Sequence, residues 1–374
     1  MSKKILILGV GSAQRDAIEL LNIEGYETYA CAKDDKGSGV DIVKHFELIN
    51  IVDYEKVKEY VINNKIDVVY SVGSDIAMPV ACKISEELNL PYFVSANTAM
   101  NCNSKDRMRT ELGPSFKGNI KYQVLESLDE VPSLAYPYII KPSDSQGQRG
   151  IFQINSIEEF KEYFPTVRNY SRSGKVIAEQ YISGPEISVN VYVVDGEIKF
   201  FIPSDRITWP EYTGLIHKHL VPSKVVTDEI YERLYDIIEN ALFVMKIYNG
   251  PAYFQLKIEN GEPYIIEMTP RLDGCHMWKI IEYHTGVNLL KLTFDHLLFG
   301  DTSELENYKK NKDSYKLEFF CQKPETIMDK NKFKVPNDSL THMFYYKSGE
   351  KIPNLNGKFE KVGYFIKKQG DNSK

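Results

Sequence analysis

The chain has 374 residues, of which 43% are apolar and 26% are charged, and its formal net charge is −6. This balance is typical of a globular protein with room for two or three domains, and the negative charge excludes the overall basicity of a non-specific nucleic-acid binder. Its five cysteines are scattered without a CxxC pair, and no apolar run is long enough to span a bilayer. We therefore expect a cytoplasmic protein with reduced thiols and with no nucleic-acid or membrane partner.

Residues 1–100 alternate short β-branched runs with helical stretches. Strand candidates occur at "KILILG", "ETYACA" and "DVVYSVG", and helices are expected over residues 13–24, 54–64 and 77–88. Repetition of strand, helix and strand at this spacing indicates a parallel sheet with right-handed crossovers. We predict a doubly wound α/β domain over these hundred residues.

The segment "GVGSAQRD" after the first strand suggests a dinucleotide-binding turn, because Gly9 and Gly11 follow a strand directly. The third glycine of that fingerprint is replaced by Gln14, and Asp34 is displaced from the position that would contact a ribose. NAD binding is therefore the weaker interpretation of this segment.

Residues 101–300 have a different texture, with hairpin turns at Asp195-Gly196 and Asn260-Gly261 and a long helix over residues 227–245. This pattern predicts an α+β domain with antiparallel sheet. The polar stretch "GDTSELENYKKNKDS" then marks a boundary before a last lobe, residues 301–374, with strands at "YKLEFF", "HMFYY" and "VGYFIKK".

The stretch "YFQLKIENGEPYIIEMTPRLDG" is a predicted hairpin with a carboxylate, Glu267, near its end. A two-residue turn would place Glu267 on the apolar face at a high cost, whereas a three-residue loop at residues 259–261 shifts the alternation by one. We therefore predict the three-residue loop. The apolar face then holds Phe254, Leu256, Ile258, Tyr264, Ile266 and Met268, and the opposite face holds Gln255, Lys257 and Glu267.

In that register Gln255 and Glu267 are diagonal neighbours, so two oxygen donors converge on one point. Oxygen donors suit a hard cation such as Mg²⁺. Arg271, four residues after Glu267, adds a positive charge for phosphate or carboxylate. A salt bridge at the end of a strand is an equally consistent interpretation of these residues alone.

Two earlier segments have features of a nucleotide site. In "IIKPSDSQGQRGI", Lys141 ends an apolar strand beside a small polar loop, which can neutralise and cover a phosphate, although most such loops are ordinary connections. In "VIAEQYISGPEISVNVYV", Glu179 and Glu186 lie where a short edge could contact a purine and a ribose, or they are solvated strand residues.

Taken in order, Lys105 in "NSKDRMR", Lys141 with its loop, residues 179–186 and the hairpin with Arg271 resemble the ATP-grasp superfamily. The resemblance is to the carbamoyl-phosphate-synthetase and biotin-carboxylase-like branch, which includes carboxylate–amine ligases. It implies a Rossmann-like pre-ATP-grasp domain over residues 1–100, an ATP-grasp domain over residues 101–300 and a C-terminal lobe over residues 301–374.

The resemblance also implies a role for individual residues. Lys141 and Arg271 are implied to be catalytic, and Thr269 stands where the family usually has Asn, which leaves a second metal position open. The implied nucleotide contacts are Lys105 and Lys141 with the phosphates, Gln146 and Gly147 in the covering loop, Glu179, Gln180 and Ile182 with adenine, and Glu186 with the ribose. The implied Mg²⁺ ligands are Gln255 and Glu267.

Substrate residues are less well specified. Arg206 is a candidate for binding a substrate carboxylate, and His276 either lies near an acyl phosphate or caps a turn. His217 and His219 alternate along a predicted strand, so at most one of them faces the site.

The resemblance implies an ADP-forming ligase that uses ATP and Mg²⁺ to activate a carboxylate as an acyl phosphate and couples it to an amine. Two alternatives remain: a carbamoyl-phosphate-synthetase-like enzyme that activates bicarbonate, and a nucleotide-binding regulatory protein without catalysis. The expected partners are a small carboxylate and a small amine, and a homodimer is the commonest assembly.

Overall fold

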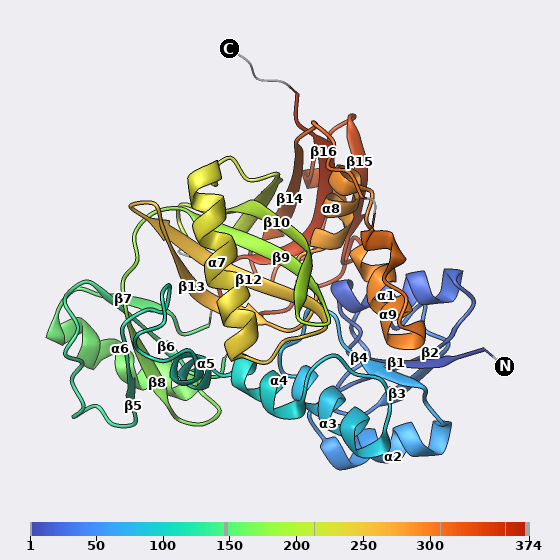
Figure 1. The fold of residues 1–374 in the computed structure, drawn as a ribbon, viewed down its shortest axis with the longest axis horizontal. Helices are drawn as coiled ribbons and strands as arrows, with labels where there is room; N and C mark the ends of the chain where they lie inside the picture. The colour runs from blue at the N-terminus through green and yellow to red at the C-terminus, as the bar shows by residue number, and fades with distance from the viewer. Residues whose placement is uncertain (1, 146–148, 213, 307, 356, 371–374) are drawn as a thin grey trace.

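The computed structural model of the protein describes residues 2–145, 149–212, 214–306, 308–355 and 357–370. Figure 1 shows the N-terminal part in blue, a small green lobe on the opposite side, and a large central sheet that continues into the C-terminal strands in red. Within the described ranges, none of the helices combines the length and the apolar character needed to cross a membrane.

The N-terminal sheet is parallel, in the order β3-β2-β1-β4. Ile5 and Ile7 pack on the same side as helix α1, whereas Leu6 and Leu8 pack against α2 and α3, so the sheet is covered on both faces as predicted. Strand β3 was not predicted, because its residues are exposed and lack an apolar run. The elements are β1 (Lys4–Leu8), α1 (Ser12–Ile23), β2 (Glu27–Ala32), β3 (His45–Leu48), α2 (Tyr54–Asn64), β4 (Val68–Tyr70) and α3 (Met78–Leu88).

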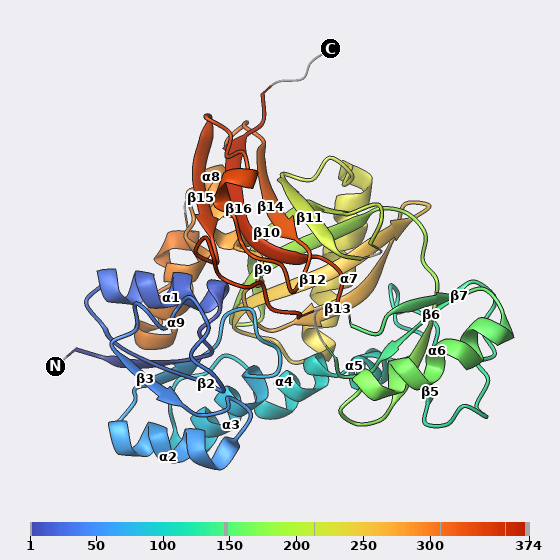
Figure 2. The same cartoon turned by 180° about the vertical axis from the view of Figure 1, so that it is seen from behind.

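Two short helices lead from this domain to the small lobe, as both views in Figures 1 and 2 show. The lobe is an antiparallel sheet in the order β5-β8-β6-β7, and Phe160 and Phe164 of helix α6 pack on it against Tyr138 and Ile140. The elements are α4 (Ala96–Asn103), α5 (Lys105–Leu112), β5 (Tyr122–Leu125), β6 (Tyr138–Pro142), β7 (Phe152–Ile154), α6 (Ile157–Tyr170) and β8 (Val176–Gln180).

The large sheet is antiparallel, in the order β13-β12-β9-β10-β11-β14-β16-β15, and helix α7 packs on it through Leu234 and Ile238. Its strands are β9 (Glu186–Val194), β10 (Glu197–Thr208), β11 (Ile216–Val221), β12 (Gly250–Glu259), β13 (Glu262–Thr269), β14 (Tyr315–Gln322), β15 (Ser339–Phe344) and β16 (Glu360–Lys368). The helical elements of this part are α7 (Asp228–Val244), α8 (Met277–Thr285), α9 (Leu289–Phe299) and the 3₁₀ turns η1 (Ser303–Leu305) and η2 (Lys330–Lys332).

The C-terminal strands continue this sheet, because β14 pairs with β11 and β16 pairs with β14. The boundary that we predicted near residue 300 therefore lies within one continuous sheet. As a boundary between domains it stays a prediction.

The hairpin of β12 and β13 corrects our prediction of its turn. The loop has two residues, Asn260 and Gly261, both with positive φ, so the predicted three-residue loop is wrong. The alternation is shifted instead by a β-bulge, in which Gln255 pairs with Glu267 and the next pair skips Ile266. As a result Ile265 is buried on the core face, and Ile266, which we expected there, lines a cavity.

A close contact between two glycines joins the N-terminal domain to the chain after β13. Gly73 has φ +67°, and a Cβ at this position would lie 2.6 Å from the Cα of Gly274. The Gly73 amide also donates to the carbonyl of Leu272 at 3.2 Å. A side chain here would force apart two loops that carry Asp75 and Arg271.

We expect Gly73→Ala to lower the thermal unfolding midpoint more than Gly25→Ala. Both positions have positive φ, so both variants carry a backbone strain of about 1–2 kcal/mol, but a Cβ at Gly25 meets nothing within 4 Å. The clash at Gly73 adds roughly 1–3 kcal/mol. Calorimetry of the two variants measures the difference, and an equal loss in both would contradict a role of the glycine contact.

Candidate active site

A cavity of about 390 Å³ lies between the small lobe and the large sheet. Its walls come from segments far apart in the sequence: the loop after β4, helix α5, strands β6 and β8, and the β12–β13 hairpin with the chain that follows it. The predicted site residues that line it are Lys105, Lys141, Glu179, Gln180, Ile182, Glu186, Arg206, Gln255, Glu267 and Arg271.

The deepest polar contacts form a network around Glu179, whose carboxylate is bound by Arg109 at 3.0 Å and by Lys141 at 2.6 Å. All three side chains are buried. Burial opposes ionisation of Glu179, but the charges of Arg109 and Lys141 prevail and lower its pKa to about 2. Burial lowers the pKa of Lys141, and Glu179 opposes that shift. The interpretation of Glu179 as a solvated strand residue is therefore excluded.

Arg109 also holds the bulge of the β12–β13 hairpin. Its guanidinium donates to the carbonyl of Ile265 at 2.7 Å and to that of Ile266 at 3.3 Å. These are the carbonyls at the bulge that turns Glu267 towards the cavity. Sequence reasoning missed Arg109, although it lies four residues after Lys105 and hence on the same face of α5, which was the available signal.

The geometry around Gln255 and Glu267 fits a hard cation. The two residues lie directly opposite each other in the ladder. The amide nitrogen of Gln255 donates to Glu186 at 3.0 Å, so its oxygen is the atom left to face a cation. Burial opposes ionisation of Glu267, but Lys105 and Lys141 lower its pKa, so it offers a carboxylate. Thr269, by contrast, is buried and does not belong to the residues that line the cavity.

Arg271 forms an ion pair with Asp75 at 2.5 Å. Asp75 comes from the loop after β4, so the N-terminal domain supplies a partner to the site. Burial lowers the pKa of Arg271 and the charge of Asp75 raises it, with a net increase. Burial also raises the pKa of Asp75, which makes this pair sensitive to any new charge beside it.

Four cations of the cavity are thus each paired with a carboxylate. The pairs are Lys105 with Glu267, Lys141 with Glu179, Arg206 with Glu186, and Arg271 with Asp75. A ligand with negative charge alone would compete with these carboxylates. A ligand that brings a divalent cation together with phosphates offers a new partner to both signs of charge.

Ile182, which belongs to the implied adenine contact, also lines the cavity. The carbonyl of Ile182 accepts from Lys257 at 2.8 Å, and both residues line the cavity. Gln146 and Gly147 lie outside the described residues. The side chain of Gln14 packs against the glycine turn after β1, because a Cβ at Gly9 would lie 3.3 Å from it. In a dinucleotide site a glycine occupies the position of Gln14.

His276 is the N-cap residue of helix α8, and its role towards a substrate stays a prediction. It is fully buried at the N-terminal end of α8 and does not belong to the residues that line the cavity. Its Nδ1 is 2.7 Å from Asp16 and its Nε2 is 2.9 Å from the hydroxyl of Tyr345. His276 therefore joins helix α1 to the C-terminal strands.

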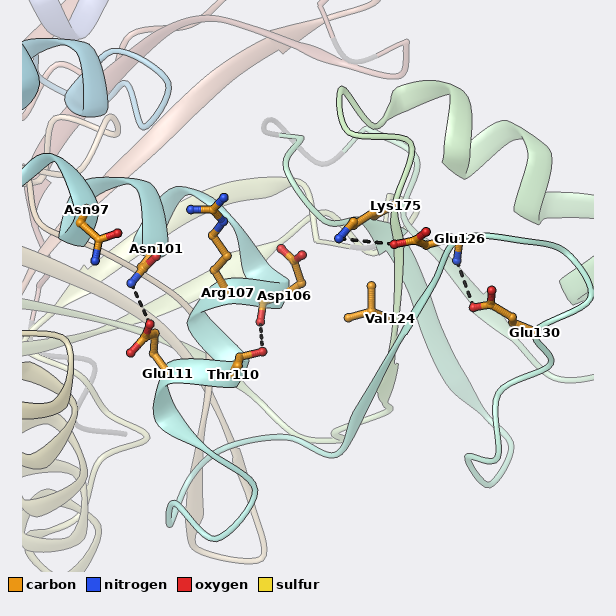
Figure 3. A pocket seen from close by; sticks show the side chains of 10 residues that line it. All are labelled: Asn97, Asn101, Asp106, Arg107, Thr110, Glu111, Val124, Glu126, Glu130 and Lys175. Atoms are coloured by element: carbon orange, nitrogen blue, oxygen red, sulfur yellow. Dashed lines mark hydrogen bonds and ion pairs between the residues drawn. The ribbon is translucent and has the colours of Figure 1, made fainter.

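A second pocket, of about 650 Å³, lies between helices α4 and α5 and the edge of the small lobe (Figure 3). Its polar side chains bind one another: Asn101 donates to Glu111 at 3.1 Å, and Lys175 pairs with Glu126 at 3.4 Å. These are ordinary surface interactions, so the cavity around Glu267 is the better candidate for chemistry.

Residues 134–278 match the family model of the ATP-grasp domain. The chain therefore contains an ATP-grasp domain. It is 23% identical over 288 residues to the alanine–anticapsin ligase of Bacillus subtilis strain 168, a match that covers 68% of the present chain and 60% of that ligase. The chain thus spans less than two thirds of the length of this curated relative.

Solved structures share the fold of nearly the whole chain. The L-amino acid ligase from Bacillus licheniformis covers 99% of this chain and 94% of its own, with a TM-score of 0.82 and 18% identity. The biotin carboxylase domain of 2-oxoglutarate carboxylase from Hydrogenobacter thermophilus, solved with MgADP and bicarbonate, covers 98% and 86%, with a TM-score of 0.78 and 16% identity. At these identities the likeness establishes the fold alone.

We expect Arg109→Met to destabilise the protein by roughly 3–5 kcal/mol, because it leaves the buried carboxylate of Glu179 with one partner fewer. Arg233→Met is the matched control, since Arg233 forms two partly exposed ion pairs and its loss should cost about 1 kcal/mol or less. Calorimetric unfolding distinguishes them. A similar loss of unfolding free energy in both variants would show that the buried network around Glu179 is not a major contributor to stability.

The stability of the protein should depend on the ionisation of Glu179. A carboxylate whose pKa is about 2 in the folded state and near 4.5 when unfolded contributes stability that is present above pH 4.5 and is lost as the pH falls towards 2. The unfolding midpoint should therefore fall more steeply between about pH 5 and pH 3 in the wild type than in Glu179→Gln. The exposed Glu126→Gln variant should follow the wild type, and parallel profiles of all three proteins would contradict the prediction.

Proposed function

We propose that this ATP-grasp protein is an ADP-forming ligase that uses ATP and Mg²⁺ to activate a carboxylate and to couple it to an amine. The observation that carries the proposal is the convergence of Lys105, Lys141, Gln255, Glu267 and Arg271 on one cavity. Two lysines, one arginine and two oxygen donors are the groups that phosphoryl transfer requires. The relative and the solved structure that are named ligases support the same reaction class.

The proposed roles follow from the contacts. Gln255 and Glu267 hold Mg²⁺, which neutralises phosphate charge when it is bound. Lys105 and Lys141 bind the phosphates, and Arg271 stabilises the transferring phosphoryl group. Glu186 binds the ribose, and the backbone of residues 179–182 borders the adenine. Because Glu179 is committed to Lys141 and Arg109, its side chain positions the lysine and its backbone is the part that faces the base.

The proposed reaction has two steps. The γ-phosphoryl group passes from ATP to a carboxylate oxygen, which gives ADP and an acyl phosphate. The amine then attacks the acyl carbon, the bond from that carbon to the bridging oxygen breaks, inorganic phosphate leaves, and the amine nitrogen loses a proton. The chain's own groups position the reactants and neutralise charge, so no protein nucleophile is needed.

The test is a measurement of ADP and phosphate release in the presence of ATP and Mg²⁺, with a panel of carboxylates, amines, amino acids and bicarbonate. Release that requires one acid and one amine together supports the ligase. Release that requires bicarbonate supports the bicarbonate-activating alternative. Tight nucleotide binding without release from any combination would contradict the ligase and favour a regulatory role. A homodimer stays a prediction.

We expect Glu267→Gln to lower the rate of ADP formation by about 10²–10³-fold and to retain nucleotide binding, because the variant keeps its size but loses the charge that faces the cation. Glu262→Gln is the control, since Glu262 lies on the same strand but pairs with Arg233. Turnover and nucleotide affinity are measured for both. Wild-type turnover in Glu267→Gln would exclude Glu267 as the metal ligand.

A further inference from the structure

The cavity also contains charged groups that the proposed nucleotide site does not use. Asp273, Cys275 and Lys361 line it, and Lys361 comes from strand β16, outside the residues that match the ATP-grasp model. We call these three residues the inner subsite.

Lys361 lacks a carboxylate partner in the described part of the chain. Its ammonium lies 3.6 Å from the sulfur of Cys275 and 4.6 Å from the centre of the Phe319 ring. No described aspartate or glutamate lies within ion-pair distance of it, in contrast to the four paired cations of the nucleotide end. A cation in a cavity that has no described carboxylate within ion-pair distance is suited to binding an anionic ligand group.

The carboxylate of Asp273 lacks a hydrogen-bond donor for one of its two oxygens within the described structure. It is 5% exposed, and one of its carboxylate oxygens accepts from the amide of Cys275 at 3.0 Å. The other oxygen is buried and has no hydrogen-bond partner among the described residues. A buried carboxylate oxygen without a donor is costly, so this position favours a ligand that supplies one.

Asp273 also lies near the reacting end. Asp273 follows the proposed phosphoryl-binding Arg271 by two residues, and both side chains line the cavity. Lys361 belongs to a different strand and borders the cavity through Cys275. A ligand in the inner subsite thus meets an acceptor, Asp273, two residues after Arg271 in the chain, and a cation, Lys361, beside Cys275.

We propose that the inner subsite binds the amine substrate, and that this substrate is an amine that also carries a carboxylate. The carboxylate pairs with Lys361, and the amino group approaches Asp273 beside the acyl phosphate. This proposal rests on the proposed function, because it takes the acyl phosphate to form at Arg271.

A metal ion is the competing occupant. The ligand atoms of His219, Asp273 and Cys275 lie within 4.8 Å of one another, and both ring nitrogens of the buried His219 lack a hydrogen-bond partner in the described structure. Burial and the charges of Arg206 and Lys361 lower the pKa of His219, so the ring is neutral, as metal binding would require. The same two positive charges repel a cation at this position, and they favour an anionic group instead.

The cysteines provide a test that needs no turnover. Cys275 is partly exposed in the cavity, whereas Cys31, Cys82, Cys102 and Cys321 are buried. Alkylation by N-ethylmaleimide at mildly alkaline pH should therefore modify Cys275 first, and a ligand in the inner subsite should slow it. The probes are the protein amino acids, each compared with its carboxamide and with the matching acid that lacks the amino group, in the presence of Mg²⁺ and ADP.

We expect at least one amino acid to protect Cys275 in the wild type, and its carboxamide and deaminated forms to protect at least tenfold less well. Lys361→Ala should abolish this preference for the acid over the amide, and Lys361→Arg should retain part of it. Lys367→Ala is the matched control, because Lys367 lies on the same strand but pairs with Asp338. It should behave as the wild type.

Equal protection by acid and amide, unchanged protection in Lys361→Ala, or no protection by any amino acid would overturn the proposal. Protection by Zn²⁺ in the wild type and in Lys361→Ala, without protection by amino acids, would also overturn it and assign the subsite to a metal. The proposed ligase activity and the proposed inner subsite are contradicted by different outcomes. Protection without any ADP formation contradicts the ligase, whereas ADP formation with amines that lack a carboxylate contradicts the inner subsite.

Discussion

The buried side chain of Arg109 is the contact on which the shape of the cavity depends. It joins helix α5 to strand β8 through Glu179 and to strand β13 through the carbonyls of Ile265 and Ile266. A buried guanidinium without these acceptors would be strongly destabilising, so the three elements must assemble together. Lys141 shares the carboxylate of Glu179. One set of charge-assisted bonds therefore fixes both a lysine of the cavity and the bulge that directs Glu267 into it.

The pairing of charges in the cavity places a condition on its ligand. Lys105, Lys141 and Arg271 are neutralised by carboxylates in the protein itself, so phosphates alone would have to displace Glu267, Glu179 or Asp75. Displacement leaves a carboxylate unpaired in a buried site, which is costly. A divalent cation bound with the phosphates gives the displaced carboxylates a new partner. This exchange accounts physically for the proposed joint use of ATP and Mg²⁺.

The sequence was sufficient where local pattern decides the structure and insufficient where distant contacts do. The alternation in β1 predicted the doubly wound domain, and the order of motifs identified residues that the fold brings to one cavity. The turn of the hairpin was predicted wrongly, because a longer loop and a β-bulge shift the alternation equally, and the choice depends on Arg109, which lies more than 150 residues away. The contacts of His276 could not be predicted, because nothing local reveals Asp16 and Tyr345 as its partners.

The continuity of the large sheet brings a strand from outside the matched segment to the cavity. Lys141, Glu179, Glu267 and Arg271 lie within the residues that match the ATP-grasp model, so the proposed nucleotide end of the cavity is built from the matched part of the chain. Strand β16 lies outside that part, yet it reaches the same cavity because β14 links it to β11. A change on β16 can therefore alter the part of the cavity around Lys361 and leave the matched segment intact. The proposed binding of the amine at Lys361 thus assigns selectivity to the C-terminal strand rather than to the segment that matches the ATP-grasp model.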